Sequence, residues 1–229
     1  PILARGGGTS QCGQTVGEAL VIDNSRHLRQ ISELDVAART VKVQPGVVLD
    51  QLNAELKPHG LWFPVDVSTS AQATLGGMAG NNSCGSRSIA YGNMVHNVLG
   101  IDALLADGTE QFFGPFGDDG NAMLKTGRAS KLVSALFEIA ERERDEIIRQ
   151  WPQVLRRVAG YNLDVFCPRS PQARPSFLIA FLSRMWRIKA MLAESLSMMC
   201  GRLVVSRQAG RYQISRLSSI CPSRKLHRV

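Results

Sequence analysis

Two glycine-rich segments limit, more than any other feature, how this chain can fold. The first, residues 5–15, carries three consecutive glycines directly after the apolar run 2–4. Because glycine has no Cβ, several backbone N–H groups can converge there on one bound group. Such a concavity binds phosphate oxygens, and the hydroxyls of Thr9 and Ser10 would add donors. A flexible turn is the alternative interpretation of three glycines taken alone.

Neither of the two common phosphate motifs fits this first segment. The spacing from Gly8 to Thr15 is that of a Walker A loop, but Gln14 stands where the phosphate-binding lysine is required. The Rossmann pattern G-x-G-x-x-G fails because residue 11 is glutamine and the apolar run 19–23 follows in place of a helix. We therefore expect a phosphate-binding loop between two strands.

The second segment, residues 74–87, contains four glycines and two adjacent asparagines. A packed turn explains the glycines but not the density of polar amides beside them. Together the two segments predict a binding site for a large ligand that has a diphosphate and a polar ring.

The remaining hydrophobic pattern mixes short strands with helices. Apolar runs bounded by turn residues predict strands, and apolar residues at helical spacing predict one short and one long helix. The expected strands are 2–4, 19–23, 40–44 and 97–106, and the expected helices are 47–56 and 131–151. This order predicts an α+β fold without internal repeats.

The net positive charge comes from one end of the chain. The formal net charge is +8, but residues 1–167 carry −3 and residues 168–229 carry +11. A nucleic-acid-binding protein needs the positive charge on its folded part, so we expect no nucleic-acid partner. No run of about 18 uncharged apolar residues occurs, so we expect no transmembrane segment.

Cysteine and histidine are scattered along the sequence. The five cysteines form no CxxC pair, and the four histidines stand singly. This pattern is typical of an intracellular, reducing compartment and predicts no metal site. A lone histidine is more often a packing or surface residue than a ligand, so no catalytic residue is assigned.

Four motifs follow one another along residues 1–167. They are RGGGTSQCGQTVG, VQPGVVLDQLNAELKPHGLWFPVDVST, TLGGMAGNNSCGSRS and NVLGIDALLADG. This order resembles the FAD-binding domain of the FAD-linked oxidases, the PCMH-type fold shared by p-cresol methylhydroxylase and vanillyl-alcohol oxidase. Within that family it is most similar to the group of D-lactate dehydrogenase and the glycolate oxidase flavin subunit. The resemblance implies an α+β domain of two α+β subdomains and FAD as the cofactor.

The resemblance also implies which residues hold FAD. The first loop would hold the diphosphate, the second loop would also contact FAD, and the residue after Asn97 would make a backbone contact to the flavin. No histidine lies in the first loop, which implies that FAD is dissociable. The residues implied are Gly6, Gly7, Gly8, Thr9, Ser10, Gly13 and Gln14 in the first loop, Gly76, Gly77, Asn82, Ser83 and Gly85 in the second, and Val98.

The activity that the resemblance implies is oxidation of a CH–OH group. The substrate would be a small D-2-hydroxy acid such as D-lactate, glycolate or D-2-hydroxyglutarate, which gives a hydride to the flavin N5. The electrons would pass to a quinone, a cytochrome or an iron–sulfur partner. The expected location is the cytoplasm, with peripheral membrane association as the alternative. A nucleotide-phosphate-binding module without redox chemistry is the alternative function.

Two departures from the family indicate a fragment. The βαβ segment that precedes the first loop in the family is missing, and so is the Gly-Ser-Glu-Gly-type turn that closes the domain. We therefore expect residues 1–167 to be a partial FAD-binding domain, incomplete at its N-terminus. The substrate-binding groups come largely from a later domain in the family, so we expect weak FAD binding and no turnover by this chain.

The last 62 residues, 168–229, differ in kind from the rest. They contain no Asp, Asn or Thr but ten Arg and ten Ser. A basic amphipathic arm and a divergent substrate domain are two explanations. Translation in a shifted reading frame is the third, and it accounts together for the abrupt change in composition and the loss of the closing motif. The expected domain organisation is thus 1–167, followed by an atypical basic tail that is out of frame or disordered.

Overall fold

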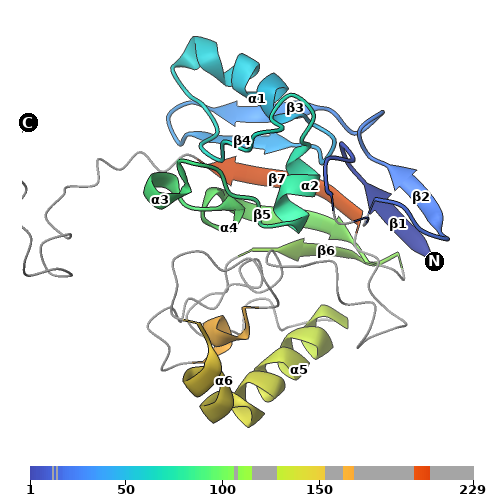
Figure 1. Cartoon of the computed structure of the whole chain (residues 1–229), viewed down its shortest axis with the longest axis vertical. Coiled ribbons are helices and arrows are strands. Elements are labelled where there is room, and N and C mark those ends of the chain that lie inside the picture. The colour runs from blue at the N-terminus through green and yellow to red at the C-terminus, as the bar shows by residue number, and fades with distance from the viewer. Residues whose placement is uncertain are drawn as a thin grey trace, which may run out of the picture.

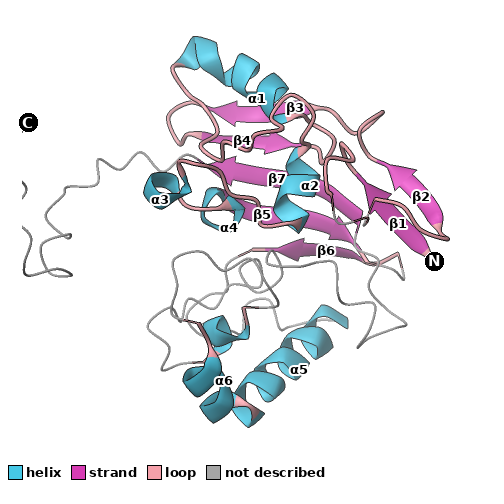
Figure 2. Ribbon diagram, in the orientation of Figure 1, coloured by secondary structure: helices cyan, strands magenta, loops and turns pink. Residues whose placement is uncertain are grey.

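The computed structural model describes residues 1–11, 13, 15–105, 108–114, 128–152, 162–167 and 199–206. These residues form two β-sheets with short helices around them (Figure 1). Strands and helices alternate along the chain, and the predicted α+β class is confirmed (Figure 2).

The smaller sheet has two parallel strands, β1 (Ile2–Arg5) and β2 (Leu20–Asp23). Both correspond to strands that the sequence predicts. Their register places Ile2 opposite Leu20 and Arg5 opposite Asp23. The first glycine-rich segment begins where β1 ends, so it lies at the carboxyl end of a parallel pair.

The larger sheet has five strands in the order β3-β4-β7-β5-β6, and every neighbouring pair is antiparallel. The predicted strands 40–44 and 97–106 are confirmed as β4 and β5, whereas β3, β6 and β7 were not predicted. The bounds are β3 (Ile31–Asp35), β4 (Thr40–Val43), β5 (Val98–Leu104), β6 (Glu110–Phe113) and β7 (Met199–Ser206).

Helices connect these strands. The predicted helix 47–56 is confirmed as α1 (Leu49–Leu56). The 3₁₀ turn η1 (Lys57–His59) follows directly and contains Pro58, which cannot continue an α-helix. The predicted helix 131–151 is two helices, α5 (Arg128–Arg142) and α6 (Arg144–Gln150), because Glu143 leaves helical geometry with φ −97° and ψ 12°. The remaining ones are α2 (Leu75–Gly80), α3 (Ser88–Tyr91), α4 (Met94–Asn97) and the 3₁₀ turn η2 (Leu163–Phe166).

The central strand of the larger sheet comes from the basic tail, residues 168–229. β7 lies between β4 and β5, and Val204 stands opposite both Lys42 and Gly100 (Figure 1). Part of the tail is therefore built into the same sheet as the strands before residue 168. The boundary at residue 167 stays a prediction, and most of residues 168–229 lie outside the described part of the chain.

The core joins α1, α2 and the strands of the larger sheet. Aliphatic side chains of α1 and α2 pack with those of β4 and β5, and near α5 the Phe137 and Phe166 rings meet edge to face at 5.1 Å. The most deeply buried side chains are Phe113, Leu49, Leu52, Leu75, Met94, Ile101, Val43, Val47 and Val65. Since α2 is anchored in this core, the second glycine-rich segment is held on a rigid base.

Candidate cofactor-binding site

The first glycine loop has a row of free backbone donors. No hydrogen bond joins the N–H groups of Gly6 to Ser10 to any part of the chain that the structure describes. Consecutive free amides after a strand form a concavity that suits phosphate oxygens. The arrangement fits the diphosphate of FAD, as the sequence predicts for Gly6, Gly7, Gly8, Thr9 and Ser10.

The two glycine loops are packed directly against each other. A Cβ on Gly6 would collide with the Thr74 hydroxyl, and one on Gly7 would collide with the carbonyl of Gln72. These glycines are therefore needed for contact within the protein, a reason that the sequence does not reveal. The contact brings the unpaired amides of the first loop beside the start of α2.

Two further glycines of the first loop need backbone conformations that other residues rarely adopt. Gly8 has φ +67° and Gly13 has φ +76°. The Arg5 guanidinium lies under Gly8, with Nη2 at 3.1 Å from the position that a Cβ would take. A positive charge is thus held beside the free amides. Gln14 lies outside the described residues.

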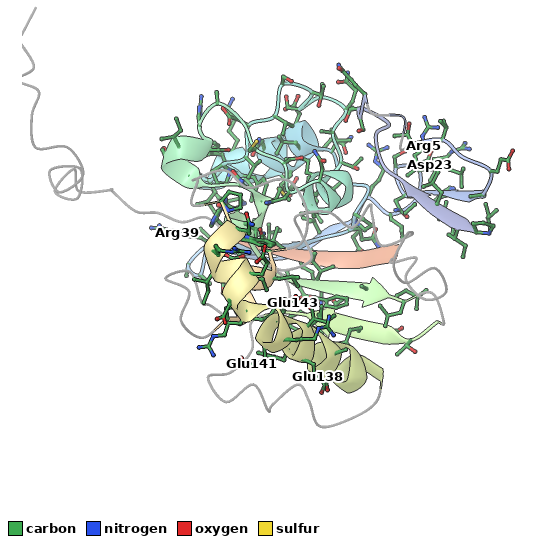
Figure 3. The ribbon with its side chains drawn as sticks, turned by 60° about the horizontal axis from the view of Figure 1, so that its bottom comes forward. Arg5, Asp23, Arg39, Glu138, Glu141 and Glu143 are labelled. Atoms are coloured by element: carbon green, nitrogen blue, oxygen red, sulfur yellow. The ribbon has the colours of Figure 1, made fainter. Side chains whose placement is uncertain are left out.

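Arg5 faces a carboxylate on the neighbouring strand. Figure 3 shows Arg5 and Asp23 on the small sheet, where they are register partners. The pKa of Asp23 is lowered, chiefly because the hydroxyl and amide of Ser25 donate to its carboxylate, and Arg5 adds a smaller attraction. The attraction of Arg5 is therefore a minor part of what keeps the Asp23 carboxylate ionised.

The start of α2 is fixed by backbone hydrogen bonds. Leu75 and Gly76 donate to the carbonyls of Val47 and Pro45, both at 2.8 Å. Gly76 has no room for a side chain because Pro45 lies against its Cα. The segment before α1 therefore holds the helix end that faces the first loop.

Thr74 precedes α2 and carries a buried hydroxyl without a partner. The residue is 2% exposed, and its Oγ1 makes no hydrogen bond in the described chain. A buried polar atom normally has a partner, so an unpaired one beside free amides fits a bound polar group. Thr74 is not among the residues predicted to bind FAD, and its place before α2 gave no signal because that helix was not predicted.

Asn82 and Ser83 hold the second loop in place. Asn82 is 1% exposed with φ +44°, and its Oδ1 accepts a hydrogen bond from the Val95 amide at 3.1 Å. Ser83 donates through its amide to Met78 at 2.9 Å and accepts from the Met94 amide at 3.0 Å. These contacts join the end of α2 to the start of α4, so the structure gives both residues a packing role.

Asn97 and Val98 form the junction between α4 and β5. The amide nitrogen of Asn97 donates to the carbonyls of Tyr91 and Asn93, each at 2.9 Å, while its Oδ1 has no partner in the described chain. Val98 is buried at the start of β5. The predicted flavin contact of Val98 is a backbone contact, which burial of its side chain does not oppose.

Two other features of the described chain bear on the site. No group of three or more His, Cys, Asp or Glu side chains that could hold a metal occurs in the part of the chain that was placed. No helix there has the length and apolar character needed to cross a membrane.

Comparison with known proteins agrees with the site's geometry. A family model described as "FAD binding domain" matches residues 1–114. D-2-hydroxyglutarate dehydrogenase of Pseudomonas putida is 39% identical over 164 residues, which are 71% of this chain and 16% of the relative. The glycolate oxidase subunit GlcD of Bacillus subtilis is 39% identical over 110 residues, 48% of this chain and 22% of the relative.

The structure of 6-hydroxy-D-nicotine oxidase of Arthrobacter nicotinovorans matches with a TM-score of 0.46 at 24% identity, over 54% of this chain and 26% of that one. This chain spans only about a sixth, 16%, of the length of the D-2-hydroxyglutarate dehydrogenase named above. The predicted family is nevertheless confirmed for the first half of the chain: residues 1–114, which contain both glycine loops, match the FAD-binding domain family.

Proposed function

We propose that this chain is the FAD-binding part of a dehydrogenase that oxidises a D-2-hydroxy acid. The observation that carries the proposal is the contact between Gly6 and Thr74, which sets a row of unpaired amides beside an unpaired buried hydroxyl. Names of relatives support the chemistry, since they include D-2-hydroxyglutarate dehydrogenase and glycolate oxidase. The family match to an FAD domain speaks against the other predicted function, a phosphate-binding module without redox chemistry.

The chain's own residues bind and orient the cofactor. The free amides of residues 6–10 would donate to the diphosphate, and Arg5 would offset its charge. Thr74 would donate its hydroxyl at the junction of the two loops. When bound, FAD supplies the redox chemistry by accepting a hydride. The full set proposed to line the site is Gly6, Gly7, Gly8, Thr9, Ser10, Gly13, Gln14, Gly76, Gly77, Asn82, Ser83, Gly85 and Val98.

The substrate and electron acceptor belong to the whole protein. The base that takes the hydroxyl proton and the cation that holds the substrate carboxylate are proposed to lie outside this chain. A quinone, a cytochrome or an iron–sulfur partner would receive the electrons; one relative, from Kluyveromyces lactis, is named D-lactate dehydrogenase [cytochrome]. We place the protein in the cytoplasm on its scattered cysteines, with no nucleic-acid partner.

Flavin titration tests this proposal. The 229-residue chain, refolded and titrated with FAD at equilibrium, should quench the flavin fluorescence, whereas ATP should compete only weakly. A variant with one substitution in the first loop, Gly7→Val, should not quench it because its side chain would strike the Gln72 carbonyl. Preferential ATP binding would instead support the non-redox module.

The extended protein tests the redox half of the proposal. The flavin absorbance should bleach with D-2-hydroxy acids and not with their L enantiomers. The 229-residue chain alone should show no such turnover. Rapid reduction in this chain would place the substrate groups within it and contradict that assignment.

A further inference from the structure

A single carboxylate anchors the second half of the second glycine loop. Asp66 lies 20 residues before Ser86, and its Oδ2 accepts a hydrogen bond from the Ser86 hydroxyl at 2.7 Å. Its Oδ1 accepts one from the Arg87 amide at 3.1 Å. The Arg87 Nε lies 3.6 Å from Oδ2. Two consecutive loop residues are therefore bound to one side chain from another segment.

The residue before them is shaped by the same carboxylate. A Cβ on Gly85 would collide with both Oδ1 and the backbone carbonyl of Asp66. The Gly85 amide donates to the Ser88 hydroxyl at 2.8 Å, which turns the chain into α3. Asp66 therefore leaves no room for a side chain at position 85. This packing alone accounts for the glycine there, without a direct contact to a cofactor.

No helix or strand spans residues 82–87, so their path depends on individual contacts, which include the backbone hydrogen bonds of Ser83 and several side-chain contacts. The Asn82 contact with Val95 holds one end. Asp66 holds the other end, and Arg87 also stacks over the Trp62 ring at 5.1 Å. Loss of the carboxylate contacts would leave residues 85–87 attached mainly through α3.

We propose that Asp66 is a positioning residue for the cofactor, because its carboxylate holds residues 85–87 in the conformation that the second loop presents to FAD. This inference rests on the proposed function. It assigns to Asp66 a role that neither the motif spacing nor the family match gives. The carboxylate acts through Ser86 and Arg87 and touches no cofactor atom itself.

The test compares Asp66→Asn with the matched control Glu55→Gln in the full 229-residue chain. Glu55 is an exposed carboxylate on α1, so the control also removes one negative charge. Hydrogen bonds to a charged group are strong enough that we expect Asp66→Asn to raise the FAD dissociation constant about tenfold. The visible circular dichroism of bound FAD should also change, whereas Glu55→Gln should alter neither.

A cofactor-free measurement separates this inference from the proposed function. Trypsin should cut after Arg87 faster in Asp66→Asn than in the wild-type chain, while cuts at other sites keep their rates. If the wild-type chain binds no FAD, the proposed function fails whatever the cleavage pattern. If it binds FAD and Asp66→Asn matches it in affinity, spectrum and cleavage, the positioning role is wrong.

Ser86→Ala keeps the inference testable if Asp66→Asn does not fold. Removing this single exposed hydroxyl should raise the FAD dissociation constant about threefold and speed the cut after Arg87. In the double variant the two effects should be less than additive, because both act through one hydrogen bond. Fully additive effects in a folded double variant, or no effect of Ser86→Ala, would contradict the proposed positioning role of Asp66.

Discussion

Gly6 lies with its Cα against the side chain of Thr74, so the end of β1 and the start of α2 meet with only the Thr74 side chain between them. The contact joins residues that are far apart in sequence and belong to different glycine-rich segments. It makes one site out of two loops. A Cβ would collide with Thr74 at position 6 and with the Gln72 carbonyl at position 7, so we expect both positions to require glycine.

Substitution of Gly6 should therefore separate the loops. Gly6→Ala places a methyl group on the Thr74 hydroxyl, which should lower the free energy of unfolding by about 1–3 kcal/mol and reduce FAD affinity. Gly17→Ala is the matched control, since its Cβ would meet only Leu3 at 3.9 Å. Urea unfolding and flavin titration measure the two effects. Equal behaviour of the two variants would show that the loops do not need this contact.

Thr74→Val should have opposite effects on stability and on binding. The substitution removes a buried hydroxyl that has no partner, so the cofactor-free chain should be unchanged or more stable by up to about 1 kcal/mol. FAD affinity should fall about threefold to tenfold if the hydroxyl donates to the cofactor. Thr40→Val on β4 is the control. Unchanged affinity in Thr74→Val would remove Thr74 from the site.

The strands and helices that the sequence predicts are those with a clear local pattern. The runs at β1, β2, β4 and β5 end at turn residues, and α1 shows its buried face at helical spacing. α2 escapes prediction because its sequence, LGGMAG, is half glycine. Tertiary hydrogen bonds to Pro45 and Val47 form its first turn, and no local propensity reports them.

The site is predictable as two loops but not as contacts. Motif order identifies both loops, yet the reason for Gly85 is a carboxylate 19 positions earlier, and the reason for Gly6 is Thr74. A contact between residues far apart in the sequence leaves no recognisable spacing between residue types along the chain. β7 escapes for a related reason: its place between β4 and β5 depends on pairing with strands about 100 or more residues away.

Acid should weaken the wild-type chain through Asp66. Burial acts to raise the pKa of this carboxyl, but hydrogen bonds from Ser86 and from the Arg87 amide, with the Arg87 charge, bring it below the model-peptide value of 3.8. A lowered pKa means that the stabilisation is complete above pH 3.8 and is lost as pH falls through the lower folded value. The charged group that faces Asp66 is Arg87, which stays protonated throughout.

Thermal unfolding from pH 6 down to about pH 3 checks this sign. At about pH 6 the unfolding midpoint temperature of the wild-type chain should exceed that of Asp66→Asn. The difference between the two midpoints should shrink as the pH is lowered toward about 3. A difference that grows on acidification would mean that Asp66 is protonated in the fold.

Cys167 should be the less reactive of the two cysteines whose side chains the structure describes. Burial, with a contribution from Asp164, raises the pKa of its thiol, and the Sγ lies 3.8 Å from the Ala140 carbonyl. Since the thiolate is the nucleophile, iodoacetamide at pH about 8 should label Cys84 well before Cys167. Mass mapping of labelled peptides measures the order. In denaturant the two rates should converge, and equal rates in the native chain would show that Cys167 is open to solvent.

The tail strand β7 should be essential for the larger sheet. Val204 pairs with Lys42 on one side and Gly100 on the other, so a proline there removes a backbone donor from the middle of the sheet. Val204→Pro should lower the thermal midpoint sharply. Val36→Pro, in the exposed turn between β3 and β4, should leave it nearly unchanged.

A chain ending at residue 167 should behave like Val204→Pro, because β4 and β5 would then lack their shared neighbour. If that shorter chain melted at the wild-type temperature, the tail strand would contribute nothing to the fold.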